Sequence, residues 1–373
     1  MQKSNSILKR TPIKLLHIVI SVVIIAILPI ILLIRIFERI IKKDIMVFNK
    51  NKERGLIGTF IHDKWLGETY TAQNNRVFVY FLMPSFGSFL LFVAFPFLQG
   101  FYYSLTDWTG LNTGDENFVG FDNYISILKD YRFAYSFYRT LIYAIFNIGL
   151  INIVAFSLAM LVTQNLKFKN IYRAGFFMPN LIGGLVLGYI WKFIFDKVLF
   201  SLGGIFDPSL LIGGETAFIS LLIVVTWQYA GYIMMIYIAA IQNIPQDLIE
   251  ASEIDGANSI QKLRNITLPL VAQAFTVAMF LTLVTAFKQF DTVVSLTQGG
   301  PSTQLPQWIG SIYNTTLLPI VKSTDLISMN IYNEAFVNYN MGIGQAKAIL
   351  FFVVLLSIAL IQVYYNKKKE VEL

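Results

Sequence analysis

The chain contains no cysteine and only two histidines, His17 and His62, among its 373 residues. The first absence excludes disulfides, cysteine-ligated zinc, iron–sulfur clusters and thiol chemistry, and two histidines are too few for a multi-histidine metal site. Charge is scarce as well, because charged residues make up 14% of the chain, against about 25% in a typical soluble domain. With 55% hydrophobic residues and a mean hydropathy of +0.61, a soluble globular fold and a disordered chain are both excluded.

A phosphate-binding loop is also missing. Such a loop needs the pattern Gly-x-x-x-x-Gly-Lys-Ser/Thr, so that backbone N–H groups and the lysine hold the phosphates, and the chain has no Gly-Lys pair. No acid–base pair lies within its apolar segments. We therefore expect no enzymatic activity, no metal and no cofactor on this chain, so that any ATP and its magnesium ion would be bound by another protein.

Long apolar segments without charge are what the chain has in abundance. A membrane-spanning helix needs about 20 such residues. The pattern predicts an all-α, multi-pass membrane protein with an N-terminal part over 1–76, a membrane core over 77–366 and a tail over 367–373. The seven candidate spans are Leu15–Ile34, Val77–Thr106, Thr140–Leu166, Ala174–Trp191, Thr216–Gln246, Asn265–Phe287 and Ala348–Asn366.

The distribution of Lys and Arg predicts the orientation of the chain. Segments 35–76, 167–173, 242–264 and 367–369 together carry about twice as many of these residues as the segments between them. Because cytoplasmic loops are enriched in Lys and Arg, we expect the C-terminus and residues 242–264 in the cytoplasm. The net charge of +7 then reflects cytoplasmic loops at a membrane rather than a nucleic-acid partner.

The first apolar segment, Leu15–Ile34, predicts an extra N-terminal helix. It is too long for a cleavable signal peptide and is followed by Arg35 and Arg39. Pro29 in its middle leaves a re-entrant or in-plane helix as the alternative. Residues 35–48 alternate apolar and basic side chains, which is typical of an amphipathic helix at the inner face but also fits a simple continuation of the first helix.

Residues 241–270, between the fifth and sixth spans, carry the most ordered local pattern. Pro245 can open a helix, because its missing N–H is not needed there, and we expect that helix over Gln246–Ile254. Gly256 follows as a helix stop, where a positive φ is easiest.

A second short helix is expected directly after this stop. Asn258 is its predicted N-cap, Gln261 completes a capping box, and Pro269 is expected to end it and begin the next span. The order of cap, stop and cap predicts a helix–turn–helix against the inner membrane face, a shape suited to docking. The alternative is an ordinary cytoplasmic connection.

This segment resembles the "EAA" loop of the permease subunits of binding-protein-dependent ABC importers. The family pattern is Glu-Ala-Ala, three residues, Gly, nine residues and Ile-x-Leu-Pro. Here Glu250-Ala251-Ser252, Gly256 and Ile266-Thr267-Leu268-Pro269 stand at the matching positions. Ser252 replaces the third Ala and Leu263 stands where the family often has Phe, both of which are small or apolar changes.

Four further stretches extend the resemblance over about residues 80–365, and it is closest to the maltose-transporter type of carbohydrate permease. Residues 302–330 form a longer outer loop than is usual, and we expect them to pack against a docked binding protein or to cap the outer vestibule; a solvated insertion without a role is the alternative. The similar stretches are FPFLQGFYYSLTDW (95–108), FKQFDTVVSLTQGGP (287–301), IYNEAF (331–336) and GIGQAKAI (342–349).

The resemblance implies a six-helix type I ABC importer permease core in the cell membrane of a prokaryote, with the extra N-terminal helix outside that core. Such a permease pairs with a second, homologous permease, two ATPase subunits dock on its inner face, and an outer solute-binding protein delivers a sugar. The residues that the resemblance places in the ATPase-coupling loop are Glu250, Ala251, Ser252, Asp255, Gly256, Ala257, Leu268 and Pro269.

A sugar pathway would need aromatic faces and hydrogen-bonding groups inside the membrane. Polar groups in a spanning helix usually face a cavity or a neighbouring helix, so helix packing is the alternative for each residue. A small-residue face of Gly183, Gly184 and Gly188 permits close helix packing. The pathway candidates are Trp227, Gln228, Tyr229, Tyr232 and Tyr237 in the fifth span, and Gln273, Thr276, Thr282, Thr285, Lys288 and Gln289 in or near the sixth.

Three other functions compete with sugar import. A stand-alone secondary transporter usually has buried carboxylates for ion coupling, whereas Asp196 and Asp291 lie only near the ends of the apolar segments. A polytopic membrane enzyme would need a catalytic constellation that the sequence does not offer. An ABC importer for another solute, such as glycerol phosphate, keeps the same coupling loop and stays open.

The missing phosphate loop leads to a first prediction. The purified chain alone should neither bind nor hydrolyse ATP, because it lacks the glycine-rich backbone and the lysine that hold the phosphates. Equilibrium binding of a fluorescent ATP analogue measures this directly. Saturable binding that unlabelled ATP displaces from the isolated chain would contradict the prediction.

Overall fold

The computed structural model describes residues 70–111, 116–164, 166–204, 207–315 and 319–367. The predicted helix over 15–34, the amphipathic segment over 35–48 and most of the tail over 367–373 therefore lie outside the described residues. By its internal contacts the chain divides into two units, residues 1–99 and 100–373, which are treated separately.

The described part of the first unit is a single helical run. Helix α3 (Tyr70–Phe89) continues through the π-turn η2 (Leu90–Ala94) into α4 (Phe95–Tyr103), which ends in the second unit. Phe81–Tyr103 is long and apolar enough to cross a membrane, and its most apolar 18-residue stretch has no buried residue. This confirms the core of the predicted span Val77–Thr106 and leaves its apolar surface available to lipid.

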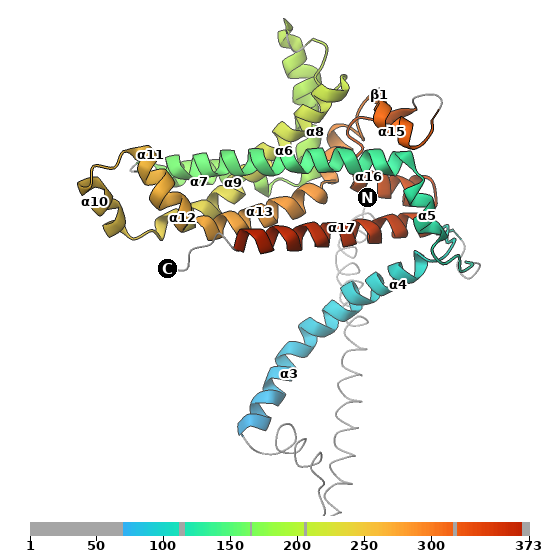
Figure 1. The fold of residues 1–373 in the computed structure, drawn as a ribbon, viewed down its shortest axis with the longest axis horizontal. Helices are drawn as coiled ribbons and strands as arrows, with labels where there is room; N and C mark the ends of the chain where they lie inside the picture. The colour runs from blue at the N-terminus through green and yellow to red at the C-terminus, as the bar shows by residue number, and fades with distance from the viewer. Residues whose placement is uncertain (1–69, 112–115, 165, 205–206, 316–318, 368–373) are drawn as a thin grey trace, which may run out of the picture. The chain divides into compact units, whose positions relative to one another are not determined.

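In the second unit, α6, α9, α13 and α17 form a bundle, with α6 packed against both α9 and α13, and α13 against α17 (Figure 1). The elements of this unit are α5 (Asp122–Leu128), α6 (Tyr131–Val162), α7 (Lys169–Phe177), η3 (Met178–Leu181), α8 (Gly184–Phe193), η4 (Ile194–Leu199), η5 (Phe200–Leu202), α9 (Gly214–Gln242), α10 (Gln246–Ile254), α11 (Ser259–Lys262), η7 (Leu263–Thr267), α12 (Leu268–Leu270), α13 (Ala272–Phe287), α14 (Asp291–Leu296), β1 (Ser302–Gln304), α15 (Gln307–Ile312), β2 (Ile320–Lys322), α16 (Ile327–Tyr332), η8 (Asn333–Val337) and α17 (Met341–Lys367).

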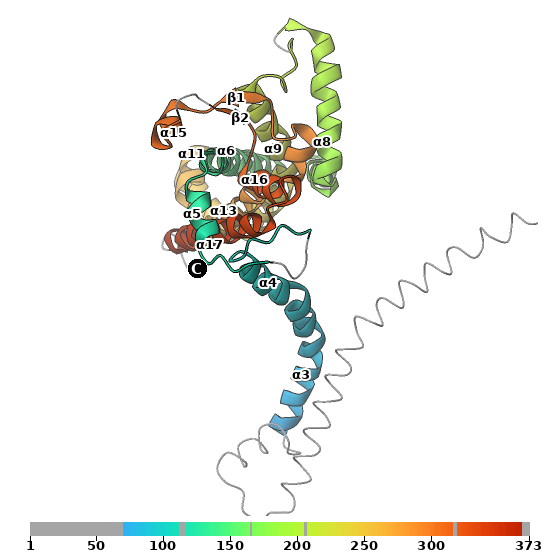
Figure 2. The same cartoon turned by 90° about the vertical axis from the view of Figure 1, so that its right-hand side faces the viewer.

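The two ends of this bundle carry different structures. Helices α10 and α11 lie at one end, whereas α5 and α16 lie at the other (Figure 1). The antiparallel pair β1–β2, with Thr303 opposite Val321, lies with α15 on one side of α6, while α17 lies on the other side (Figure 2). Segments far apart in the sequence are thus brought together at the end that faces away from α10.

Two of the predicted spans are not single straight helices. Ala174–Trp191 is divided into α7, η3 and α8, because Pro179 lies in the 3-10 turn and Ile182 has an extended ψ of 125°. Asn265–Phe287 is bent by 69° between Leu270 and Ala272. The described residues therefore contain four helices able to cross a membrane, or five with the bent pair, where the sequence predicts six core spans.

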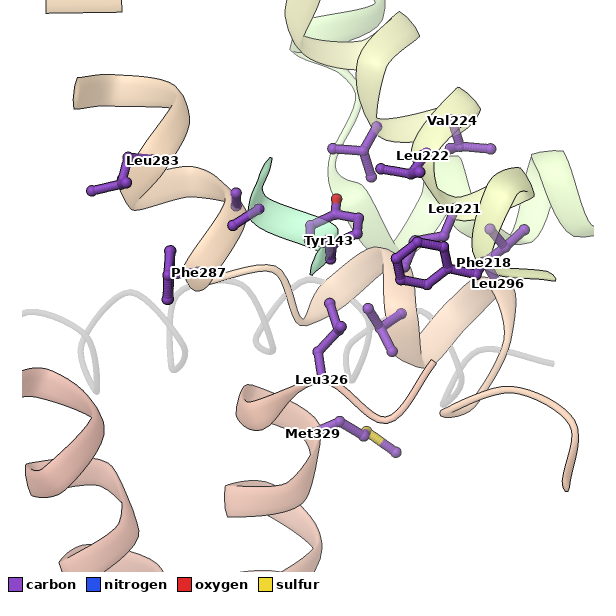
Figure 3. Close-up of a cluster of buried hydrophobic side chains, with 14 of the residues drawn as sticks. Tyr143, Phe218, Leu221, Leu222, Val224, Leu283, Phe287, Leu296, Leu326 and Met329 are labelled. Carbon is purple, nitrogen blue, oxygen red and sulfur yellow. The ribbon is translucent and has the colours of Figure 1, made fainter. Parts of the chain in front are cut away.

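The main core cluster joins α6, α9, α13, α14 and the segment around α16 (Figure 3). Tyr143 of α6 meets Phe218 of α9 edge to face, with the ring centroids 6.1 Å apart. Leu326 and Met329 are buried in the same cluster. The end of the predicted outer loop over 302–330 thus belongs to the core, while its packing against a binding protein or its capping of the vestibule stays a prediction.

Glycines let α8 approach α14 closely. A Cβ at Gly188 would collide with the Ser295 hydroxyl, and Ser295 Oγ donates a hydrogen bond to the Gly184 carbonyl at 3.3 Å. Gly183, by contrast, has open space around its Cβ position. The small-residue packing face is confirmed for Gly184 and Gly188 but not for Gly183.

A buried lysine lies at the start of α17. Lys347 is 1% exposed, and its Nζ donates to Asp130 Oδ2 at 3.1 Å, Asn330 Oδ1 at 3.0 Å and Glu334 Oε2 at 2.8 Å. Asp130 is also the N-cap of α6 and accepts the backbone N–H of Arg132. One ammonium therefore ties together the starts of α6 and α17, the helix α16 and the turn η8.

Replacing this lysine should destabilise the fold strongly. Lys347→Met keeps the length of the side chain but leaves Asp130 and Glu334 without their counter-ion, and breaking a buried ion pair in this way costs about 3–5 kcal/mol. Lys262→Met is the matched control, because it removes the exposed pair with Glu253, which is worth at most about 1 kcal/mol. Thermal unfolding in detergent, followed by tryptophan fluorescence, should show a much larger decrease of the unfolding temperature for Lys347→Met than for Lys262→Met. Equal decreases of the two unfolding temperatures would contradict the account.

Candidate functional site

The predicted helix–turn–helix over residues 241–270 is confirmed in its first half. Helix α10 begins after Pro245, whose backbone is extended, and it ends at Ile254. Gly256 has a φ of +75°, and the N–H of Ala257 donates to the Ser252 carbonyl at 2.9 Å. This hydrogen bond satisfies a carbonyl at the end of α10, as expected for a helix that stops at a left-handed glycine.

The second half keeps the predicted cap but not the predicted end. Asn258 Oδ1 accepts the N–H of Gln261 at 2.9 Å, and Gln261 Oε1 accepts the N–H of Asn258 at 2.7 Å, which is a complete capping box. The helix then runs through α11, η7 and α12. Pro269 lies in the first turn of α12 rather than ending the segment, and the chain bends at Val271 instead. Proline fits there because the first turn needs no N–H from it.

The turn is held together by exposed interactions. Lys262 Nζ lies 2.9 Å from Glu253 Oε1 and joins α11 to the end of α10. Ser252 is buried, its hydroxyl donating to the Ile249 carbonyl at 2.6 Å. The substitution of Ser for the family's third Ala thus adds a local hydrogen bond.

The segment predicted as the coupling loop has an apolar face that the described part of the chain leaves uncovered. Ile254 is 87% exposed, Ile260 is 75% exposed and Leu248 is exposed as well. Ala251, one turn before Ile254, shares that exposure. An apolar face of α10 therefore points away from the rest of the described chain. The remaining predicted loop residues are the exposed Glu250, Asp255, Gly256 and Leu268 and the half-buried Ala257 and Pro269.

On α9, the sugar-pathway candidates divide into exposed and packed residues. Trp227 and Tyr232 are exposed, and the ring of Trp227 lies edge to face with Trp191 of α8 at 5.5 Å. Gln228 is buried, and its Nε2 donates to the Ile182 carbonyl at 3.1 Å, at the break before α8. Tyr229 is half-buried between two core clusters.

Tyr237 and Thr282 join a polar network in the middle of the bundle. Tyr237 OH donates to Asn152 Oδ1 at 2.6 Å, and Asn152 Nδ2 donates to Thr282 Oγ1 at 3.1 Å. The network links α9, α6 and α13, so these two candidates have the helix-packing role that was the alternative for them. Sequence reasoning missed Asn152, although an asparagine inside the charge-free segment Thr140–Leu166 is itself a signal.

The candidates on α13 do not converge on one site. Gln273 is exposed and lines a groove of about 340 Å³ between α9 and α13, on the side of the coupling loop. Thr276 and Thr285 each donate to a carbonyl of their own helix. Lys288 and the buried Gln289 lie at the other end of α13, about 22 Å from Gln273 along the helix axis.

Comparison with known proteins assigns the chain to a family. Residues 151–371 match the family described as "Binding-protein-dependent transport system inner membrane component". The chain is 43% identical over 305 residues to the "Probable starch degradation products transport system permease protein AmyD" of Thermoanaerobacterium thermosulfurigenes, covering 81% of this chain and 97% of that protein. It is 29% identical to the "Trehalose/maltose transport system permease protein MalF" of Thermococcus litoralis, covering 75% and 90%.

A solved structure agrees with this assignment at the level of the fold. A chain of a bacterial ABC transporter for import of the acidic polysaccharide alginate superposes with a TM-score of 0.64 at 18% identity, covering 79% of this chain and 96% of that one. The chain therefore belongs to the binding-protein-dependent inner-membrane transport family and has the type I ABC importer permease fold. It is a multi-pass membrane transport subunit, which excludes the stand-alone secondary transporter and the membrane enzyme.

The turn at Gly256 generates a test of the coupling loop. A Cβ at this position would meet nothing within 4 Å, so only the positive φ restricts substitution, at roughly 1–2 kcal/mol for most residues. Gly256→Val should reduce binding-protein-dependent uptake in reconstituted vesicles about fivefold or more while membrane levels stay normal. Gly256→Asn is the matched control, because asparagine tolerates this conformation. Normal uptake by Gly256→Val would contradict the prediction.

Proposed function

We propose that this chain is the transmembrane subunit of an ABC importer that carries an oligosaccharide into the cell, driven by ATP hydrolysis on separate subunits. The choice of solute rests on the 43% identity to a permease named for starch degradation products, of which 97% is covered. A relative of Streptococcus mutans at 28% identity is named a multiple sugar-binding transport system permease.

The coupling loop is the proposed docking site of an ATPase subunit. Ile254 and Ile260 are large, exposed and apolar in an otherwise polar turn, and exposed apolar patches rimmed by polar residues mark interaction sites. Glu250 and Asp255 on the rim would meet basic side chains of the partner. ATP and its magnesium ion would bind on that partner, which supplies the motion that the loop transmits to α9 and α13.

Three further assignments complete this proposal. The loop and the C-terminus are cytoplasmic, as the excess of Lys and Arg in these segments favours. A second, homologous permease completes the pathway, with residues such as Trp227 and Tyr232 among those facing it or the solute. A solute-binding protein docks on the opposite side, in the way that the alginate transporter is described in complex with its oligosaccharide-bound periplasmic protein.

Import of glycerol phosphate is the second candidate. Two relatives at 26% identity, from Agrobacterium fabrum and Rhizobium meliloti, are named sn-glycerol-3-phosphate permeases. The same fold and loop therefore occur in proteins named for an anionic solute. The higher identity to the starch-product permease favours the saccharide for this chain.

Uptake by the assembled importer tests the proposal. The chain should be reconstituted with its partner permease, ATPase subunits and solute-binding protein, and given labelled maltotriose, maltopentaose or sn-glycerol 3-phosphate. We expect ATP-dependent uptake of the maltooligosaccharides and none of the phosphate ester. Uptake of sn-glycerol 3-phosphate alone would establish the second candidate, and saccharide uptake without ATP would contradict the coupling.

A further inference from the structure

A polar groove of about 450 Å³ is lined by residues at the end of the bundle that faces away from the coupling loop. It lies between the start of α6, the end of β2, α16 and η8. Its volume falls within the range of small-molecule sites, about 300–1,000 Å³, yet it contains none of the sugar-pathway residues predicted from the sequence. The lining residues are Asp130, Tyr131, Arg132, Lys322, Asp325, Asn330, Asn333, Glu334, Val337 and Asn338.

The charges of this groove balance. Three carboxylates, those of Asp130, Asp325 and Glu334, line it together with two cations, Arg132 and Lys322. The third cation is the buried Lys347, whose ammonium bonds both Asp130 and Glu334. Because the acids are already compensated, the groove has no net charge with which to attract a metal cation, a phosphate or another ion.

Lys347 also fixes the wall of the groove. Burial alone would raise the pKa of the Glu334 carboxyl, but hydrogen bonds from Lys347 and from Asn340 outweigh it and hold the pKa below the usual value. Glu334 is thus a charged hydrogen-bond acceptor with a fixed orientation. Such a preorganised acceptor binds a ligand hydroxyl more strongly than a mobile one does.

Several groups in the groove retain hydrogen-bonding capacity. Asp325 Oδ1 is buried without a hydrogen-bond partner, although its Oδ2 accepts from Ser136 at 2.9 Å. Arg132 makes one long contact, from Nε to Tyr131 OH at 3.4 Å. The amide side chain of Asn333 makes no hydrogen bond within the described part of the chain. Arg132 and Asn333 therefore remain available to a ligand with acceptor groups, whereas Asp325 Oδ1 is covered by the protein itself.

We propose that this groove is an outer saccharide-binding subsite, which takes a neutral, hydroxyl-rich ligand before it enters the membrane. The inference rests on the proposed import of an oligosaccharide and adds a site to it. Vicinal sugar hydroxyls would donate to the Glu334 carboxylate and accept from Arg132 and Asn333. Amphipathic rings such as that of Tyr131 suit the less polar faces of sugars.

A docking protein is the other occupant that such a groove could take. Protein interfaces, however, are depleted of charged residues at their centre and enriched in aromatic anchors. Val337 and the ring of Tyr131 are the main apolar groups of the groove. The other lining residues carry carboxylates, amides or cationic groups. The observations therefore favour a small polar ligand.

Direct binding to the assembled transporter tests this subsite. Saturation-transfer NMR with maltopentaose should be recorded on the whole complex in nanodiscs, without ATP and without the solute-binding protein. Asn333→Ala and Arg132→Gln should each weaken the saccharide signal about fivefold, since a lost hydrogen bond to a ligand costs about 1 kcal/mol or more. Gln307→Ala is the matched control, because this exposed amide on α15 lies outside the groove and should change nothing.

Two parallel measurements separate the possible failures. An unchanged saccharide signal in both groove variants would overturn the subsite. If the variants also lose affinity for the loaded binding protein while the saccharide signal is unchanged, the groove is a docking surface instead. Saccharide uptake by the unaltered importer is the check on the proposed function. If that uptake is normal while the groove binds no maltopentaose, the subsite alone is wrong; if no saccharide is imported, the proposed function itself fails.

Discussion

The ion cluster around Lys347 is the constraint on which the end of the bundle opposite the coupling loop depends. Removing an ammonium from water costs several kcal/mol, which is recovered only when its partners are placed well. Here the partners come from three places in the sequence, Asp130, Asn330 and Glu334. Their positions must therefore be fixed together, and the segments around α16 become part of the bundle.

A second buried cation stabilises the same end of the bundle, opposite the coupling loop. Arg139 of α6 donates to the Ser323 carbonyl at 2.9 Å and lies 3.2 Å from Glu215 at the start of α9. Its guanidinium carbon also lies 4.1 Å from the centre of the Phe218 ring. The two cations hold the starts of α6, α9 and α17 against the segment that follows β2, and Lys347 also fixes Asp130, Asn330 and Glu334, which line the polar groove.

The opposite end is built from weaker, local interactions. The coupling loop depends on a capping box, an exposed ion pair and one glycine with positive φ, while Ile254 and Ile260 remain uncovered. Between the ends, the Asn152 network joins α6, α9 and α13. The proposed coupling requires that the end opposite the loop is firmly fixed and that the loop has a free surface for a partner, because a force on the loop then moves whole helices.

Local features of this fold could be predicted from the sequence, and non-local ones could not. The start of α10, the stop at Gly256 and the capping box depend on residues within four positions of each other, and all three are confirmed. The break at Ile182 and the bend at Val271 are not predicted, although Pro179 and Pro269 lie two or three residues before them. The role of Lys347 is not predictable from the sequence, because its partners lie 13, 17 and 217 residues away along the chain.

The most direct test of the coupling claim uses the absence of cysteine, which makes any introduced thiol unique. Ile254→Cys in the coupling loop and Ile312→Cys, exposed on α15 at the other end, should be treated with a membrane-impermeant maleimide. We predict labelling of Ile312→Cys in intact cells, and labelling of Ile254→Cys only in inside-out vesicles, where adding the ATPase subunits protects it. Labelling of Ile254→Cys from outside the cell, or equal labelling with and without the ATPase subunits, would contradict the account.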